Sequence, residues 1–590
     1  MSFNHFYQSE LAALRTLGRQ FAERNPALAR FLGEGGQDPD VERLLEGFAF
    51  LTGRLRQKLD DELPELTHSL MHLLWPNYMR PLPSFGMLQF EPLRQAAPIT
   101  VPRETSVESK AINGVRCRFQ TCYETEVSAL QLVALDCVAT GEGTVMQLRL
   151  AMTCDGHFGE LGLKRLRFHL AGERYVSQAL YLHLLRHLDR IELVPLGADH
   201  QPIDLGMSCT LAASQLAPVG FAEDESLIPY PVNTFRGYRY LQEYFAFQDK
   251  FLFVDLSGLD VLGAVPGTQS EQVRGLEIRF AMSVTVMESC RPGLDNLKLY
   301  CTPVANLFKH EAVPVRLDGK QDEYLVLPAE FEPRTCGVFS VDTVVGWLPG
   351  GSGYRPYVPF ESFVHDPGQE PSQGSPCYSV RQRPASAHGA MDTYLGFGPA
   401  RGSQDETLSI ELTCTNLDLP SALAQGDICL PTEETPAFLR FGNIGLATPS
   451  YAPPLDRGFL WKLISNMSLN YLSLADVEVL KAILETYDLP RYHDRHAEKV
   501  SKRLLDGLVA IRPAYVDRLH RGLPLRGVAT ELTIDPEGYR GEGDLFVFAS
   551  VLNEFLALYA SLNSFHELTV ISKRGGVYQW SPRMGQQPLL

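Results

Sequence analysis

The sequence lacks a hydrophobic run long enough to cross a bilayer. The closest candidate, residues 545–562, contains Ser550, Asn553 and Glu554 and is more typical of a buried helix. The first residues, MSFNHFYQSE, have no basic stretch followed by an apolar one, so we expect no signal peptide. The 11 cysteines are scattered without a CxxC pair, which favours reduced thiols over a disulfide framework or a zinc site. These absences predict a cytosolic protein.

The recognisable motifs of enzymes and nucleotide-binding proteins are also missing. There is no G-x-S-x-G turn, no GxxxxGK[ST] loop and no GxGxxG after an expected strand. Acidic clusters such as Glu223-Asp224-Glu225 are interpreted as solvated charge. Three histidine pairs have spacings at which both side chains could face one ion, but a zinc site needs three or four ligands: His68 and His72, His183 and His187, His493 and His496. The sequence therefore predicts no catalytic set, no cofactor and no metal.

Acidic charge dominates the composition. The net charge is −17 and the pI is near 5.4, which argues against a general nucleic-acid or anionic-membrane surface. The chain has 590 residues, which is too long for one core, so roughly three to five domains are expected. The 48 glycines and 40 prolines indicate many turns and therefore much β structure.

The strongest periodic pattern lies near the N-terminus. Asp38 can cap a helix that Pro39 opens and that continues to about residue 61. Apolar residues recur there at three- and four-residue steps and share one face: Val41, Leu44, Leu45, Phe48, Leu51, Leu55 and Leu59. Such a stripe is most often an ordinary core helix, but it can equally pack on another chain.

The order of expected elements indicates an α+β multidomain protein. Residues 1–84 are predicted to be helical, with several apolar stripes, and residues 85–225 to form a first β-rich domain. Residues 226–455 form a second β-rich region with an exposed Pro/Gly-rich loop at 348–376, and residues 456–590 a C-terminal α/β domain.

The aromatic segment at 230–256, YPVNTFRGYRYLQEYFAFQDKFLFVDL, allows two interpretations. Aromatic side chains beside Arg236 and Arg239 can stack on a base or a sugar, which would make the chain a β-rich carbohydrate- or small-ligand-binding protein or an enzyme. Aromatic residues fill cores far more often, so a packed core corner is the favoured interpretation.

Several ordered stretches closely resemble the TssF family of type VI secretion baseplate subunits, also called VasA or ImpG. The first is VERLLEGFAFLTGRLRQKLDDELPELTHSLMHLLWPNYMRPLPS at 41–84. Others follow in order along the chain: PITVPRETSV at 98–107, FRGYRYLQEYFAFQDKFLFVDL at 235–256, LTCTNLDLPSAL at 412–423, LWKLISNMSLNYLSL at 460–474, DLFVFASVLNEFLALYASLNSFHELTV at 544–570 and WSPRMGQQPLL at 580–590. The chain departs from the family at Leu417, where arginine is more usual, and any polar contact expected there is in doubt.

The resemblance implies a structural role without catalysis, in a fold similar to the wedge subunits of contractile-phage baseplates. The family's expected partners are a second copy of the chain, TssG, TssE, TssK and the VgrG hub, and through the baseplate the TssB/TssC sheath and the TssJ–TssL–TssM membrane complex. The expected location is the bacterial cytoplasm, at the inner face of the inner membrane. On this interpretation the N-terminal stripes join a helical bundle with the second copy and TssG, and the candidate interface residues are Val41, Leu44, Phe48, Leu51, Leu55, Leu59, Trp75, Trp461 and Tyr471.

Overall fold

The computed structural model describes most of residues 75–455 and 476–585. Within these ranges it omits residues 96, 156–157, 204–208, 232–236, 265–271, 319–320, 333, 348–352, 361–375, 385–390, 398–405 and 521–522. Elsewhere it describes only residues 7, 11, 14, 40–41, 43–52, 54, 71–72 and 463. The chain divides into two compact units, Met1–Pro76 with Leu455–Trp461, and Asn77–Pro454 with Lys462–Leu590.

The described part of the first unit is helical, as the apolar periodicity predicts. Residues 40–41, 43–52 and 54 are all in α-helix. These residues give a helix but do not support the predicted N-terminal helical bundle, and most of residues 1–74 lie outside the described residues.

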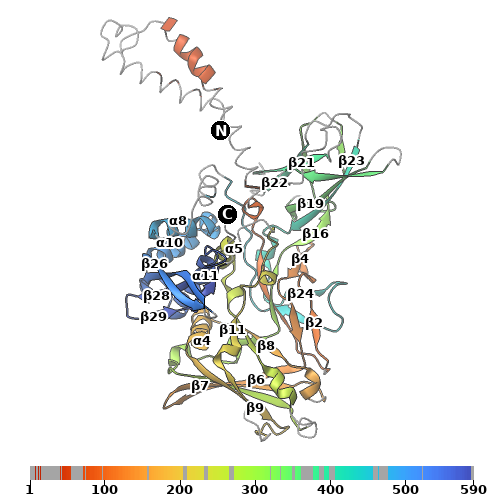
Figure 1. Cartoon of the computed structure of the whole chain (residues 1–590). Coiled ribbons are helices and arrows are strands. Elements are labelled where there is room, and N and C mark those ends of the chain that lie inside the picture. Colours follow the sequence, from red (N-terminus) through yellow and green to blue (C-terminus); the bar gives the residue numbers. More distant parts are fainter. Residues whose placement is uncertain are drawn as a thin grey trace, which may run out of the picture. The chain divides into compact units, whose positions relative to one another are not determined.

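The second unit is built mainly from antiparallel sheets (Figure 1). The strands of a six-stranded sheet run in the order β24 (Ile428–Pro431), β3 (Ser106–Ile112), β4 (Val115–Thr121), β15 (Cys301–Ala305), β1 (Phe85–Phe90) and β25 (Phe441–Asn443). Segments more than 300 residues apart thus pair directly, for instance Leu88 on β1 with Asn443 on β25. Two short strands, β2 (Ile99–Val101) and β5 (Thr125–Val127), form a separate pair.

Two further sheets pack against helix α4 (Arg174–Arg186). One has the order β10 (Thr210–Ala212), β9 (Leu188–Leu196), β13 (Gly275–Met282), β7 (Gly143–Met152) and β6 (Leu130–Thr140). The other has the order β11 (Leu216–Pro218), β12 (Phe253–Ser257), β8 (Arg165–Leu170) and β14 (Leu297–Leu299). Helix α4 contacts strands of both, and seven of its residues are buried.

The eight-stranded sheet corrects one expectation. Its order is β16 (Phe308–Glu311), β23 (Glu406–Thr415), β19 (Gly337–Trp347), β20 (Tyr354–Pro359), β21 (Cys377–Pro384), β22 (Met391–Phe397) and β18 (Glu323–Val326), with β17 (Val315–Leu317) also on β23. Strand β20 lies inside the segment predicted to be one long loop, 348–376, so that prediction is wrong for residues 354–359. Strand β19 supplies a pairing partner that the Pro/Gly content of the segment does not reveal.

The C-terminal part encloses an almost completely buried helix, α11 (Glu542–Ala557). Strand β27 (Leu523–Ile534) pairs in parallel with β28 (Phe565–Ser572), and α11 is the connection between them. The same sheet contains β26 (Leu508–His520), β29 (Val577–Gln579) and β30 (Arg583–Met584), and it is accompanied by α8 (Val477–Tyr487), α9 (Pro490–His493) and α10 (Arg495–Asp506). Helix α11 also contacts α4 and α5 (Gly237–Ala246). It is buried on nearly every side because its residues are apolar nearly all round.

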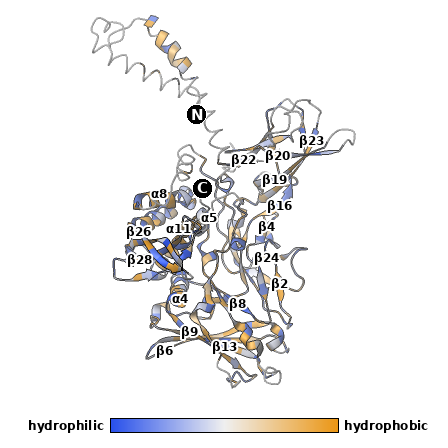
Figure 2. Ribbon diagram, viewed as in Figure 1, coloured by the Kyte–Doolittle hydropathy of each residue, from blue (hydrophilic) through white to orange (hydrophobic). Residues whose placement is uncertain are grey.

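The described residues confirm an α+β protein with β-rich middle regions. Figure 2 shows hydrophobic and hydrophilic residues mixed along most strands, as expected where one side of a sheet faces a core. The division into four domains, with its three boundaries, stays a prediction. Among the described residues, no helix is both long and apolar enough to span a bilayer.

Candidate functional site

The apolar stripe of the N-terminal helix is exposed. Leu44, Phe48 and Leu51 have 73%, 56% and 66% of their surface accessible, and Val41 is half-buried. Covering a large apolar side chain stabilises by about 1.5–3 kcal/mol, so this face is more stable against a partner than in water.

The structure does not show the other candidate interface residues as exposed. Trp75 is 4% exposed, so it is already covered within this chain. Leu55, Leu59, Trp461 and Tyr471 lie outside the described residues. The assignment of all nine residues to an interface stays a prediction.

The described part of the aromatic segment, 230–231 and 237–256, is a core corner. On α5, Tyr238 stacks on Tyr487 with ring centroids 4.5 Å apart, and its hydroxyl accepts a hydrogen bond from that of Tyr559 at 2.8 Å. Tyr240 and Tyr244 are 8% and 5% exposed. The core interpretation is confirmed, and the alternative ligand surface is wrong because these rings are already packed against the protein. Arg236 lies outside the described residues.

Behind this corner lies a buried cluster of charged side chains. Lys250 is completely buried, contacts the Glu243 carboxylate through Nζ, and donates a 2.9 Å hydrogen bond to the carbonyl of Glu225. Burial lowers the pKa of Lys250, although Glu243 acts in the opposite direction. Arg239, one helical turn before Glu243, donates to the carbonyls of Phe221 and Ala222.

The cluster fixes the acidic loop onto the β8–β12 pair. Glu225 accepts from the backbone N–H of Gly220 at 2.7 Å and from Nη2 of Arg167 at 2.9 Å. Arg167 on β8 also makes a two-pronged ion pair with Asp255 on β12. The interpretation of the acidic loop as solvated charge is therefore wrong for Glu225, which is 9% exposed. Its counter-charge is 58 residues away, and no local sequence signal reveals it.

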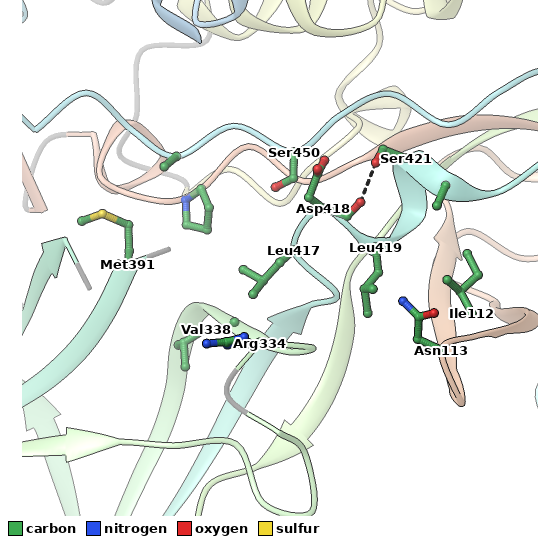
Figure 3. A pocket seen from close by; sticks show the side chains of 14 residues that line it. Ile112, Asn113, Arg334, Val338, Met391, Leu417, Asp418, Leu419, Ser421 and Ser450 are labelled. Atoms are coloured by element: carbon green, nitrogen blue, oxygen red, sulfur yellow. Dashed lines mark hydrogen bonds between the residues drawn. The ribbon is translucent and has the colours of Figure 1, made fainter. Parts of the chain in front are cut away.

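An open pocket of about 670 Å³ lies beside the Leu417 turn (Figure 3). Leu417 has a backbone φ of 53°, a left-handed conformation that is unusual for a branched apolar residue. The preceding residue, Asn416, is fully buried and exchanges hydrogen bonds with Asn306 at 2.7 and 2.9 Å. Arg334 and Asp418 also line the pocket. The lining of this pocket mixes apolar residues such as Val338 and Leu419 with polar ones such as Asn113 and Ser450.

The histidine pairs lie in ordinary packing environments where they are described. His183 and His187 on α4 have ring centroids 5.9 Å apart, and burial together with His187 lowers the pKa of His183 to about 4. His493 shares a 2.7 Å hydrogen bond with the carbonyl of Ala452. Within the described ranges, no group of three or more His, Cys, Asp or Glu side chains could hold a metal ion. His68 lies outside those ranges.

Comparison with known proteins identifies the chain's relatives. Residues 1–587 match the family described as type VI secretion system, TssF. The chain belongs to the TssF family. It is similar to the type VI secretion system component TssF1 of Pseudomonas aeruginosa, with 31% identity over 99% of each chain.

Two solved structures are similar to this member of the TssF family. A chain of the type VI secretion TssK-TssF-TssG baseplate subcomplex matches with a TM-score of 0.77 and 32% identity, over 93% of this chain and 99% of that one. A chain of the type VI secretion baseplate complex matches with a TM-score of 0.60 and 27% identity over the whole of both.

Proposed function

We propose that this chain is a structural subunit of the type VI secretion baseplate and acts as a scaffold rather than an enzyme. The observation that carries the proposal is its similarity to the matching chain of the TssK-TssF-TssG subcomplex, which extends over 99% of that chain. The exposed apolar stripe is the second support, because a scaffold presents surfaces that other chains cover.

On this proposal the chain pairs with a second copy and TssG in a wedge that also joins TssK and TssE. The wedge surrounds the VgrG hub, connects to the TssB/TssC sheath, and docks on the TssJ–TssL–TssM membrane complex from the cytoplasmic side. Leu44, Phe48 and Leu51 then lie in a seam between helices of different chains. The remaining members of the nine-residue set belong to the same proposed interface region.

The test is a pull-down of the tagged full-length chain from its native bacterium, with subunits identified and counted by native mass spectrometry. We expect TssG- and TssK-like chains, and more than one copy of the tagged chain in each complex. Phe48→Asp should abolish this assembly, because it places an unpaired charge in an apolar seam.

Leu446→Asp is the matched control. Leu446 is exposed like Phe48, at 71% against 56%, but lies outside the stripe, so the Leu446→Asp variant should assemble normally. Recovery of the unmodified chain alone after gentle lysis would contradict the scaffold. Normal assembly of Phe48→Asp would exclude the stripe from the seam while leaving the scaffold intact.

A further inference from the structure

One face of the eight-stranded sheet exposes two aromatic side chains from neighbouring strands. Trp347 at the end of β19 is 55% exposed, and its direct partner Tyr354 on β20 is 70% exposed. The opposite face of these strands forms a closed apolar core that includes Val344, Tyr357 and Ile410. The aromatic pair therefore contributes little to the fold.

The strand register continues this face into a strip. Next to the aromatic pair, Val345 lies between its cross-strand partners Pro356 and Ser409. Pro356 and Ser409 are exposed and Val345 is half-buried, so the middle of the strip is open and largely uncharged. Figures 1 and 2 label these strands in the same part of the second unit, and the pairing gives their order as β16, β23, β19 and β20.

The far end of the strip is acidic. Glu411 on β23 lies opposite Thr343 on one side and Glu311 on β16 on the other, and both carboxylates are exposed. Thr343 donates to Glu411 at 2.8 Å, but no cation within the described residues pairs with either glutamate. The neighbouring Lys309 forms an ion pair with Asp342 instead, with Nζ and Oδ2 2.8 Å apart. Like charges directly opposite each other destabilise a sheet, so a cation brought by a ligand is favoured here.

The spacing between the two ends restricts the ligand. Trp347 lies four residues from Thr343 along β19, about 13 Å, and Glu411 lies one strand further across, so it is about 14 Å from Trp347. An extended or polyproline segment rises about 3.1–3.4 Å per residue and covers that distance in about four residues. Exposed Trp and Tyr bind proline rings in such segments. The rings are inclined at 52° to each other, so they form no flat platform for a sugar.

We propose that this face, defined by Trp347, Tyr354, Val345, Pro356, Glu411 and Glu311, binds an extended segment of another protein. The segment presents a proline to Trp347 and Tyr354, and an arginine or lysine four residues away to Glu411 and Glu311. This inference does not rest on the proposed function, because it concerns a surface that the N-terminal stripe does not include.

The test uses the purified full-length chain and fluorescently labelled peptides in anisotropy titrations. The probes are Gly-Pro-Ala-Pro-Ala-Arg-Gly, the reversed order Gly-Arg-Ala-Pro-Ala-Pro-Gly, and versions with Gln for Arg or Ala for Pro. We expect saturable binding of one order, and a loss of affinity of about tenfold or more for Trp347→Ala and for Tyr354→Ala. Glu411→Gln should weaken binding of the peptide that contains Arg, but should leave binding of the Gln version unchanged.

Tyr515→Ala is the control, since Tyr515 is 61% exposed on another sheet and its replacement should leave binding unchanged. Trp347 and Tyr354 lie outside the core, so all these variants should melt within a few degrees of the unmodified chain.

The proposal is overturned if neither peptide order saturates, or if Trp347→Ala binds like the unmodified chain. Trp347-dependent binding of chitohexaose without peptide binding would assign the face to carbohydrate instead. If Trp347→Ala abolishes self-association in sedimentation experiments but leaves peptide binding unchanged, the face binds a second copy of the chain instead.

Discussion

Lys250→Met is expected to destabilise the α5–β12 region strongly. The substitution keeps the unbranched apolar stem of Lys250 but removes the ammonium group that contacts Glu243. Glu243 is 2% exposed, and its second oxygen accepts from the backbone N–H of Leu227 at 2.8 Å. Breaking a buried ion pair from one side costs about 3–5 kcal/mol where the remaining charge is left uncompensated. Nε of Arg239 lies 3.9 Å from the Glu243 oxygen that contacts Lys250 and offsets part of this cost, so we expect a loss at the lower end of that range.

The double variant separates that charge from lost packing. Glu243→Gln removes the carboxylate but retains an oxygen that can accept from Leu227. Combined with Lys250→Met, it should recover about 1–3 kcal/mol relative to the sum of the single changes. Lys110→Met is the control, since the ion pair of Lys110 with Asp427 is 61% and 25% exposed and solvent screens it, so its loss should change local stability little.

The measurement is hydrogen–deuterium exchange of peptides that cover residues 220–257, followed by mass spectrometry. Exchange reports the local opening free energy, which global unfolding of a long, multidomain chain does not resolve. If Lys250→Met changes the opening free energy by less than about 1 kcal/mol, Arg239 or water compensates the Glu243 charge fully, and the reasoning fails. The reasoning also fails if the double variant is as unstable as the sum of the single ones.

Two further predictions concern the Leu417 turn and the helix pair α8–α9. Gly337→Ala should lower the local opening free energy of peptides around residues 337 and 417, measured by hydrogen exchange, by about 1–3 kcal/mol, because the new Cβ would lie 2.4 Å from Leu417 Cδ2. Gly337→Ala with Leu417→Ala should recover most of the loss, and no recovery would locate the clash elsewhere. Burial raises the pKa of the Asp488 carboxyl from its ordinary value of 3.8 to about 6, so its contribution to stability is complete below pH 3.8 and is lost as the pH rises through 6. Asp488→Asn should remove a decline of about 3 kcal/mol from the stability–pH curve between these values, and an unchanged curve would contradict the assignment.

Local pattern was sufficient to predict many elements. The apolar run at 545–562, predicted to be a buried helix, contains most of α11. The described residues 43–52 of the predicted N-terminal helix are in α-helix. These predictions succeeded because side-chain period and turn residues act over a few neighbours. Helix α10 and strand β20 were missed, since charged surface positions and prolines obscure their periodicity.

The sequence by itself determined the family, the absence of known catalytic motifs, and the helical stripe that carries Leu44 and Phe48. Only the tertiary structure decided the environment of charges and aromatic residues. Glu225 and Lys250 are 25 residues apart in sequence and meet because Arg167 on β8 binds Glu225 and Glu243 on α5 contacts Lys250. Trp347 is exposed because strand register, rather than residue type, assigns it to the outer face. Pairing between distant segments depends on the whole chain, and a local pattern cannot specify it.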